Sequence, residues 1–127
     1  MVTVACIPAF NEGQNIARIV HSCAKHVDKV IICNDGSTDN TESEAFSAGA
    51  YVINHTTNMG KGKSMKSLFE LCKFINADIV ITIDGDGQFL PAEIPKLTKD
   101  IEDGKSDIVI GYRFETEKDM PSYRKIG

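Results

Sequence analysis

Two acidic residues and a glutamine follow an apolar stretch in the second half of the chain. Residues 79–83 read Ile-Val-Ile-Thr-Ile, which is typical of a buried strand, and Asp84, Asp86 and Gln88 come soon after it. Because alternate side chains of an extended chain point the same way, these three oxygen-bearing groups could converge on one point. Oxygen ligands suit Mg²⁺ or Mn²⁺, which are often held by one or two carboxylates together with substrate phosphates. Taken alone, this spacing is more typical of a solvated acidic turn; the motifs described next favour a metal site for nucleotide chemistry instead.

Two further polar segments also follow predicted strands. The first consists of Pro8, Ala9, Phe10, Asn11 and Glu12. The second, residues 34–39, reads Asn-Asp-Gly-Ser-Thr-Asp and contains Asp35 and Gly36. The carboxylate of Asp35, at the tip of its strand, could accept hydrogen bonds from a base or a ribose, and Gly36 permits a tight or left-handed turn. For both segments the alternative is a turn that caps the following helix.

A glycine-containing basic segment precedes the third predicted helix. Residues 58–63 read Asn-Met-Gly-Lys-Gly-Lys, and a helix N-terminus of this kind can bind phosphate, with Lys61 as a candidate contact. The spacing is not that of a P-loop. Lysines early in a helix oppose the helix dipole, and a bound anion would offset that cost. A solvated basic face is the alternative interpretation.

Strand and helix patterns alternate along the chain. We expect strands at 2–8, 29–33, 50–53, 78–83 and 107–110, and helices at 15–26, 39–49, 63–75 and 92–102. This alternation, with nearly continuous apolar strands, predicts an α/β fold with a mostly parallel sheet covered by helices on both faces. Ligands of such sheets bind outside the carboxyl ends of the strands. Segments 8–12, 34–39 and 84–88 all fall there, which predicts that they form one site.

Length and composition restrict the class of protein. The chain has 127 residues, which predicts one domain over 1–127. Its net charge of −4 and scattered basic residues give no electrostatic case for nucleic acid. No stretch approaches the ~18 apolar residues of a membrane span, and the start lacks a charged leader, so we expect a cytoplasmic protein. The four cysteines show no Cys-x-x-Cys spacing and are expected to be buried free thiols.

Taken in order, these motifs resemble the nucleotide-sugar-binding part of family 2 glycosyltransferases, in particular the polyprenol (dolichol) phosphate sugar transferase branch. The resemblance covers roughly residues 2–113. It depends on segments 8–12, 34–39, 58–62 and 84–88, and Gly111-Tyr112-Arg113 is similar to a Gly-Ser-Arg segment of that branch. It implies a Rossmann-like fold of the GT-A type with an Asp-x-Asp metal site.

The resemblance also implies a reaction and a role for each motif. The reaction is the inverting transfer of a hexose from a UDP- or GDP-sugar, with Mg²⁺ or Mn²⁺ neutralising charge on the departing nucleoside diphosphate. The implied roles are a nucleoside pocket lined by Pro8, Phe10, Glu12 and Asp35, a position near the ribose and diphosphate for Asp84 and Gly85, and metal ligation by Asp86 and Gln88.

The implied acceptor is a polyprenyl phosphate at the membrane surface. Its attacking oxygen is already ionised, so no strong general base is needed. Arg113 and Arg124 are candidates to hold this phosphate, because arginine pairs well with phosphate oxygens. Together with Asp86 they are the candidate catalytic residues. Solvated surface arginine is the alternative for both.

Relatives in this branch are longer, and the resemblance implies that residues 113–127 begin an acceptor-side part that is absent. We therefore expect self-association, or a partner that supplies the acceptor half, since missing strands would leave an edge or apolar patch exposed. One alternative function is a non-catalytic nucleotide-binding module. A nucleotidyltransferase is less favoured, because its glycine-rich basic loop would follow the first strand, where segment 8–12 stands.

Overall fold

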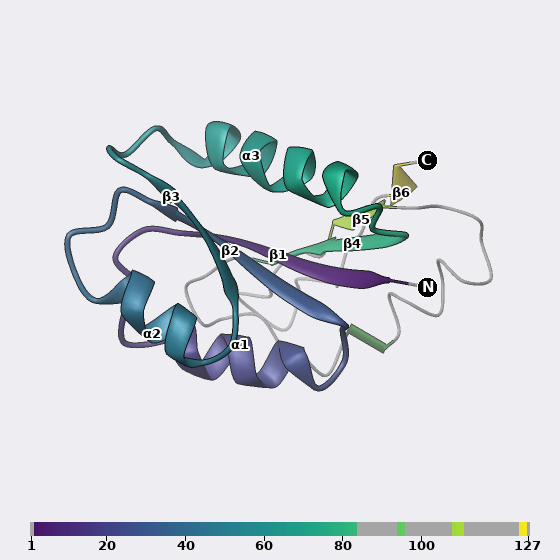
Figure 1. Ribbon diagram of the computed structural model, residues 1–127, viewed down its shortest axis with the longest axis horizontal. Coiled ribbons are helices and arrows are strands. Elements are labelled where there is room, and N and C mark those ends of the chain that lie inside the picture. Colours follow the sequence, from purple (N-terminus) through teal and green to yellow (C-terminus); the bar gives the residue numbers. More distant parts are fainter. Residues whose placement is uncertain (1, 84–93, 96–107, 111–124, 127) are drawn as a thin grey trace, which may run out of the picture.

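The computed structural model describes residues 2–83, 94–95, 108–110 and 125–126. They form a six-stranded sheet in the order β3-β2-β1-β4-β5-β6, with helices on both faces (Figure 1). The strands are β1 (Thr3–Ala9), β2 (Lys29–Asp35), β3 (Tyr51–His55), β4 (Ile79–Thr82), β5 (Ile108–Ile110) and β6 (Lys125–Ile126). The helices are α1 (Ile16–Ala24), α2 (Thr41–Ser47) and α3 (Lys61–Phe74). Strands β1 to β5 pair in parallel and β6 pairs antiparallel to β5, which confirms the predicted mostly parallel α/β sheet.

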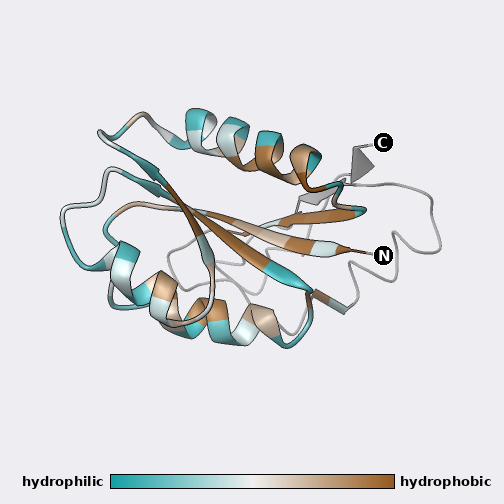
Figure 2. Cartoon of the chain, in the orientation of Figure 1, coloured by the Kyte–Doolittle hydropathy of each residue, from teal (hydrophilic) through white to brown (hydrophobic). Residues whose placement is uncertain are grey.

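The two faces of the sheet carry separate apolar clusters. Along β1, Ala5 and Ile7 belong to the cluster that contains the buried side chains of α1, whereas Val4 and Cys6 belong to the cluster under α3. This alternation follows from the two-residue period of a strand. Figure 2 shows the hydrophobic residues concentrated in the strands, between helices that present polar residues outward. Central strands buried on both faces explain the nearly continuous apolar runs in the sequence.

The helices bury the apolar stripes that their sequences predict. In α1 the buried residues are Ile16, Ile19, Val20 and Cys23. In α3, Leu68 and Cys72 are buried, and Met65 and Phe69 pack beside them as partly buried residues. Helix α2 ends before Gly49, whose φ of 102° is the left-handed conformation that makes glycine a common residue after a helix.

Several element boundaries differ from the prediction. Strand β2 continues to Asp35 rather than ending at Cys33, because Asn34 and Asp35 pair with Asn54 and His55 of a correspondingly longer β3. Helix α2 begins at Thr41 instead of Asp39, and α3 begins at Lys61, two residues earlier than expected. Of the helix predicted over 92–102, the structure describes Ile94, which is fully buried, and Pro95.

Pro8 lies inside a central strand, where its missing N–H would normally break a ladder. Its position explains why it is tolerated. The carbonyl of Cys6 points toward β4 and accepts a hydrogen bond from Ile83 N at 2.9 Å. The backbone nitrogen of Pro8, two residues later, points the same way. Because the β1–β4 pairing ends at the pair Cys6–Thr82, no partner in β4 requires an N–H from Pro8.

All four cysteines are free and buried, as predicted. The Sγ atoms of Cys6 in β1 and Cys72 in α3 lie 3.2 Å apart. Burial raises the pKa of Cys23 to about 12, so this thiol is protonated at neutral pH. None of the helices within the described ranges is long and apolar enough to cross a membrane.

Helix α3 offers a matched pair of substitutions that tests the packing. Leu68 is fully buried, whereas Phe74 is 82% exposed. Leu68→Ala should lower the free energy of unfolding by roughly 2–5 kcal/mol because it leaves a cavity under the helix. Phe74→Ala should change it by less than about 0.5 kcal/mol. Urea denaturation of both variants measures the difference, and similar losses would contradict the placement of α3.

Candidate functional site

The strand order reverses direction between β1 and β4. From β1 the chain proceeds through α1 to β2 on one side, and α3 carries it back across β1 to β4 on the other (Figure 1). A crevice at the carboxyl ends of the strands at such a point is the usual ligand site of an open α/β sheet. Segment 8–12 lies there, with Pro8 and Ala9 at the end of β1 and residues 10–12 in the loop that follows. Ile83 leaves β4 beside them, still hydrogen-bonded to Cys6, and the next residue is Asp84.

Several predicted site residues lie outside the described residues. They are Asp84, Gly85, Asp86, Gln88, Arg113 and Arg124. Within the described ranges, no group of three or more His, Cys, Asp or Glu side chains is placed to hold a metal ion. Asp84, Asp86 and Gln88 follow β4 in the sequence. Their side chains offer carboxylate and amide oxygens, which are the ligand atoms that suit Mg²⁺ or Mn²⁺.

The loops after β1 and β2 bind each other directly. Asn11 has a positive φ of 53°, its N–H donates to Ser37 Oγ at 2.9 Å, and its Oδ1 accepts from Thr38 N at 2.8 Å. Glu12 N donates to Thr41 Oγ1 at 3.0 Å. The prediction that segments 8–12 and 34–39 share one edge is therefore confirmed.

Asp39 extends the same network. Its Oδ2 accepts a hydrogen bond from Gly13 N at 3.0 Å, and its Oδ1 accepts from both the hydroxyl and the backbone N–H of Thr41. The Thr41 hydroxyl is the main cause that lowers the pKa of Asp39, with the Gly13 and Thr41 amides adding to it against some desolvation. Asp39 thus stabilises the start of α2 and also holds the β1–α1 loop.

The residues of segment 8–12 have different environments. Phe10 is 45% exposed at the edge of the site, whereas Ala9 is 4% exposed and packs in the core. Pro8 and Glu12 are half-buried. The carbonyl of Glu12 accepts hydrogen bonds from the N–H groups of Asn15 and Ile16 at the start of α1. The segment therefore caps the start of α1, as the alternative interpretation proposed. It also places Phe10 and Glu12 at the carboxyl ends of the strands.

Asp35 is buried at the end of β2, where its carboxylate accepts three hydrogen bonds. Oδ1 accepts from His55 Nδ1 at 2.8 Å and from Met59 N at 2.8 Å, and Oδ2 accepts from Gly60 N at 2.9 Å. Desolvation alone would raise the pKa of Asp35, but the bonds from Met59, His55 and Gly60 outweigh it and leave that pKa below its usual value. A buried, ionised carboxylate therefore lies at the predicted position.

The glycine segment before α3 is folded onto this carboxylate. Gly60, with a φ of 95°, is the residue before the first turn of α3, and Lys61 begins the helix with an exposed side chain. The sequence predicted that this helix start could bind phosphate, with a solvated basic face as the alternative. In the structure the amides of Met59 and Gly60 bind the Asp35 carboxylate.

Gly36 makes that close approach possible. Its φ is +74°, and a Cβ added there would lie 2.5 Å from both Asn58 N and the carbonyl carbon of Thr57. The predicted tight, left-handed turn at Gly36 is confirmed. The backbone of residues 57–58 thus lies directly against the turn that follows Asp35.

His55 and Ser67 were missed by the sequence analysis. His55 ends β3 and is the register partner of Asp35, and its Nε2 lies 2.9 Å from Ser67 Oγ on α3. The sequence did contain a signal, since a histidine at the end of the third strand falls on the same edge as the other motifs. His55 was missed because this strand was predicted to end at Ile53, two residues before it.

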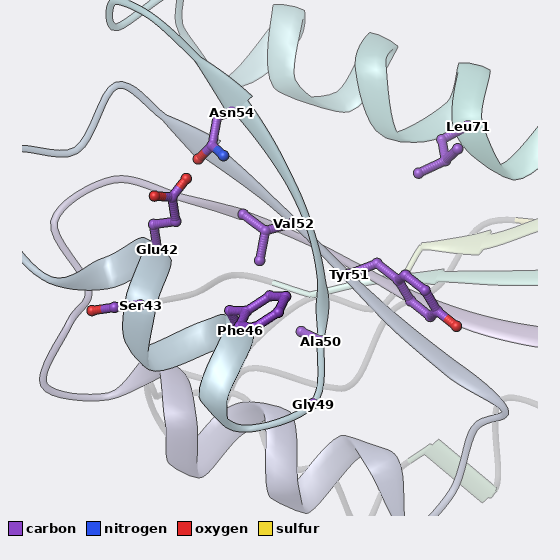
Figure 3. A pocket seen from close by; sticks show the side chains of 9 residues that line it. All are labelled: Glu42, Ser43, Phe46, Gly49, Ala50, Tyr51, Val52, Asn54 and Leu71. Atoms are coloured by element: carbon purple, nitrogen blue, oxygen red, sulfur yellow. The ribbon is translucent and has the colours of Figure 1, made fainter.

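A separate hollow of about 990 Å³ lies along the edge strand β3 (Figure 3). Phe46 of α2 and Tyr51 of β3 contribute exposed aromatic rings to it. Among the predicted site residues that the structure describes, none lines this hollow. It is therefore distinct from the edge formed by the strand ends.

Comparisons with known proteins agree with this geometry. The family model described as glycosyl transferase family 2 matches residues 4–126. An uncharacterized protein of Methanocaldococcus jannaschii is 39% identical over 97% of this chain and 56% of its own length. The UDP-N-acetylglucosamine–dolichyl-phosphate N-acetylglucosaminyltransferase of Methanococcus voltae is 31% identical over 95% of this chain and 57% of its own length. The chain thus spans a little over half the length of these relatives.

Solved structures show the same likeness. Glucosyl-3-phosphoglycerate synthase from Mycobacterium tuberculosis in complex with UDP has a TM-score of 0.68 and 27% identity, covering 83% of this chain and 41% of that one. The same enzyme with Mn²⁺ and UDP-glucose has a TM-score of 0.66 and 27% identity, covering 82% and 40%. These are glycosyltransferases of the GT-A type, so the predicted fold type is confirmed.

The packing around Gly36 predicts opposite effects for two glycine substitutions. Gly36→Ala should lower the free energy of unfolding by roughly 2–3 kcal/mol, because it combines an unfavourable φ with a backbone clash. Gly62→Ala should be neutral or stabilising by up to about 1 kcal/mol, since its added Cβ meets nothing within 4 Å. Chemical denaturation checks both, and a tolerated Gly36→Ala would show that residues 57–58 do not lie against the turn.

The lowered pKa of Asp35 predicts an acid dependence of stability. Since its folded pKa lies below the unfolded value of 3.8, the ionised carboxylate stabilises the fold fully above that value and progressively less as pH falls through the folded pKa. The difference in unfolding free energy between the wild type and Asp35→Asn should therefore shrink as the pH falls below about 4. Denaturation at a series of pH values measures it, and a constant difference would contradict the assignment.

Proposed function

The chain belongs to glycosyl transferase family 2, and from this premise we propose that it forms the donor site of an inverting glycosyltransferase that uses a UDP-hexose. The observation that carries the proposal is the meeting of the β1 and β2 loops, linked through Asn11, with the end of β4 at the reversal point of the sheet. A nucleotide placed there would contact segment 8–12, Asp35 and the residues that follow Ile83.

The hydrogen bonding of Asp35 favours uracil over guanine. Oδ1 already accepts two hydrogen bonds, and Oδ2 accepts one from among the described donors. A carboxylate oxygen has about two acceptor positions, so Asp35 retains room for a single N–H. Uracil offers one such group, its N3–H, whereas guanine offers N1–H and N2–H to both oxygens of a carboxylate. The UDP complexes of the mycobacterial enzyme support the same choice.

We propose that Asp84, Asp86 and Gln88 hold Mg²⁺ or Mn²⁺ and that Asp84 and Gly85 lie near the ribose and diphosphate. When bound, such an ion offsets the negative charge of the diphosphate as the sugar bond breaks. The Mn²⁺ present with UDP-glucose in the mycobacterial enzyme supports this assignment. Lys61 begins α3 directly after Gly60, whose amide binds Asp35, and we propose it as a contact for the diphosphate.

The proposed acceptor is a polyprenyl phosphate. The names of relatives support it, among them the dolichyl-phosphate enzyme of Methanococcus voltae and an undecaprenyl-phosphate 4-deoxy-4-formamido-L-arabinose transferase of Pseudomonas savastanoi, which is 31% identical. A phosphate oxygen is ionised at neutral pH and attacks the sugar without a strong base. Arg113 and Arg124 are proposed to hold that phosphate through charge-assisted hydrogen bonds.

Calorimetric titration with UDP and GDP, each with and without Mn²⁺, tests the donor site. We expect UDP to bind more tightly than GDP and only when metal is present. Asp86→Ala should abolish the metal-dependent binding with an unchanged circular dichroism spectrum. Asp35→Ala should weaken UDP roughly tenfold or more while leaving the metal dependence unchanged. Binding of UDP that is indifferent to metal and to both variants would overturn the proposal.

A further inference from the structure

A continuous chain of hydrogen bonds runs from Asp35 through His55 to α3. His55 Nδ1 lies 2.8 Å from Asp35 Oδ1, and His55 Nε2 lies 2.9 Å from Ser67 Oγ. The side chains of His55 and Asp35 are only 11% and 6% exposed. Cys33 Sγ lies 3.7 Å from Nε2 and packs beside the imidazole ring. The imidazole is therefore enclosed and fixed at both of its nitrogen atoms.

The partners of the ring determine its tautomer. An ionised carboxylate only accepts hydrogen bonds, so Nδ1 carries the proton and donates it to Asp35. In the neutral ring Nε2 is then an acceptor, and it receives the hydroxyl hydrogen of Ser67. A histidine held in this way fixes the orientation of the carboxylate it bonds, as outer-shell partners do around other functional groups.

The order carboxylate, imidazole, hydroxyl is also that of a hydrolase triad, but the helix argues against that chemistry. Ser67 lies seven residues into α3 counting Lys61 as the first, where the nearby N–H groups donate to carbonyls of the preceding turn. They are thus not free to stabilise an oxyanion. The arrangement holds a carboxylate in place, and the serine serves as its far anchor.

We propose that His55 is a positioning residue for nucleotide recognition, because it holds the Asp35 carboxylate in the orientation that accepts the N3–H of uracil. This inference rests on the proposed function. Without His55, Oδ1 loses a charge-assisted bond and keeps only that from Met59 N. The carboxylate can then turn, because only two of its three hydrogen bonds remain, those from the backbone amides of Met59 and Gly60.

The test measures the preference for UDP over CDP in the presence of Mn²⁺. The two nucleotides differ at the position Asp35 is proposed to read, since N3 of cytosine carries no hydrogen and repels a carboxylate. The wild type should prefer UDP at least tenfold. His55→Ala should weaken UDP roughly tenfold while leaving CDP unchanged, so the preference collapses. A merely structural role would weaken both nucleotides in proportion.

Three further variants sharpen the result. His55→Asn places an amide N–H near the position of Nδ1 and should restore most of the preference. Ser67→Ala removes only the far anchor and should cost less than His55→Ala. His26→Ala, an exposed histidine just beyond α1, is the matched control and should leave binding unchanged. Nitrogen NMR of the wild type should show that Nδ1 of His55 carries a hydrogen, a readout that needs no nucleotide.

The outcomes separate this inference from the function it rests on. A wild type that does not prefer UDP over CDP overturns the proposed uridine site and the inference together. A wild type with that preference, retained in His55→Ala, overturns the inference alone. So does a His55 ring protonated at Nε2 instead of Nδ1, because it could not donate to Asp35. Loss of preference in His55→Ala with recovery in His55→Asn supports it.

Discussion

The arrangement of the site depends on one buried carboxylate. Asp35 lies at the carboxyl end of β2, and its two oxygens bind the amides of Met59 and Gly60 and the ring of His55. These donors come from the end of β3 and from the segment that starts α3. A charge taken out of water is costly unless it is well hydrogen-bonded. The need to satisfy this group therefore determines where the β3–α3 segment lies and where α3 begins.

The two layers of helices serve the site in different ways. Helix α3 covers one face of the sheet and connects to the Asp35 carboxylate through Ser67 and His55. On the other face, α1 and α2 begin at loops that are bound to each other by Asn11, Asp39 and Thr41. Strands β1 and β2 contribute residues to both apolar clusters and also end at this edge, so they connect the packing of the core with the geometry of the edge.

Much of the fold followed from local sequence patterns, because apolar strands and amphipathic stripes are short-range signals. The meeting of segments 8–12 and 34–39 followed from parallel topology alone. What could not be predicted depended on pairing between distant residues. The extension of β2 to Asp35 needs the register with His55 twenty residues away, which no local pattern specifies. For the same reason the hydrogen bonds from the amides of Met59 and Gly60 to Asp35 could not be predicted, because they join residues more than twenty positions apart.

The mutual binding of the β1 and β2 loops has a thermodynamic consequence. Asn11 adopts a positive φ, a conformation that is uncommon outside glycine, and its bonds to Ser37 and Thr38 hold it there. The loss of conformational entropy from ordering these loops therefore occurs during folding and does not recur when a ligand binds. A ligand that lands on this edge meets a surface already arranged, and more of its contact energy remains as net affinity.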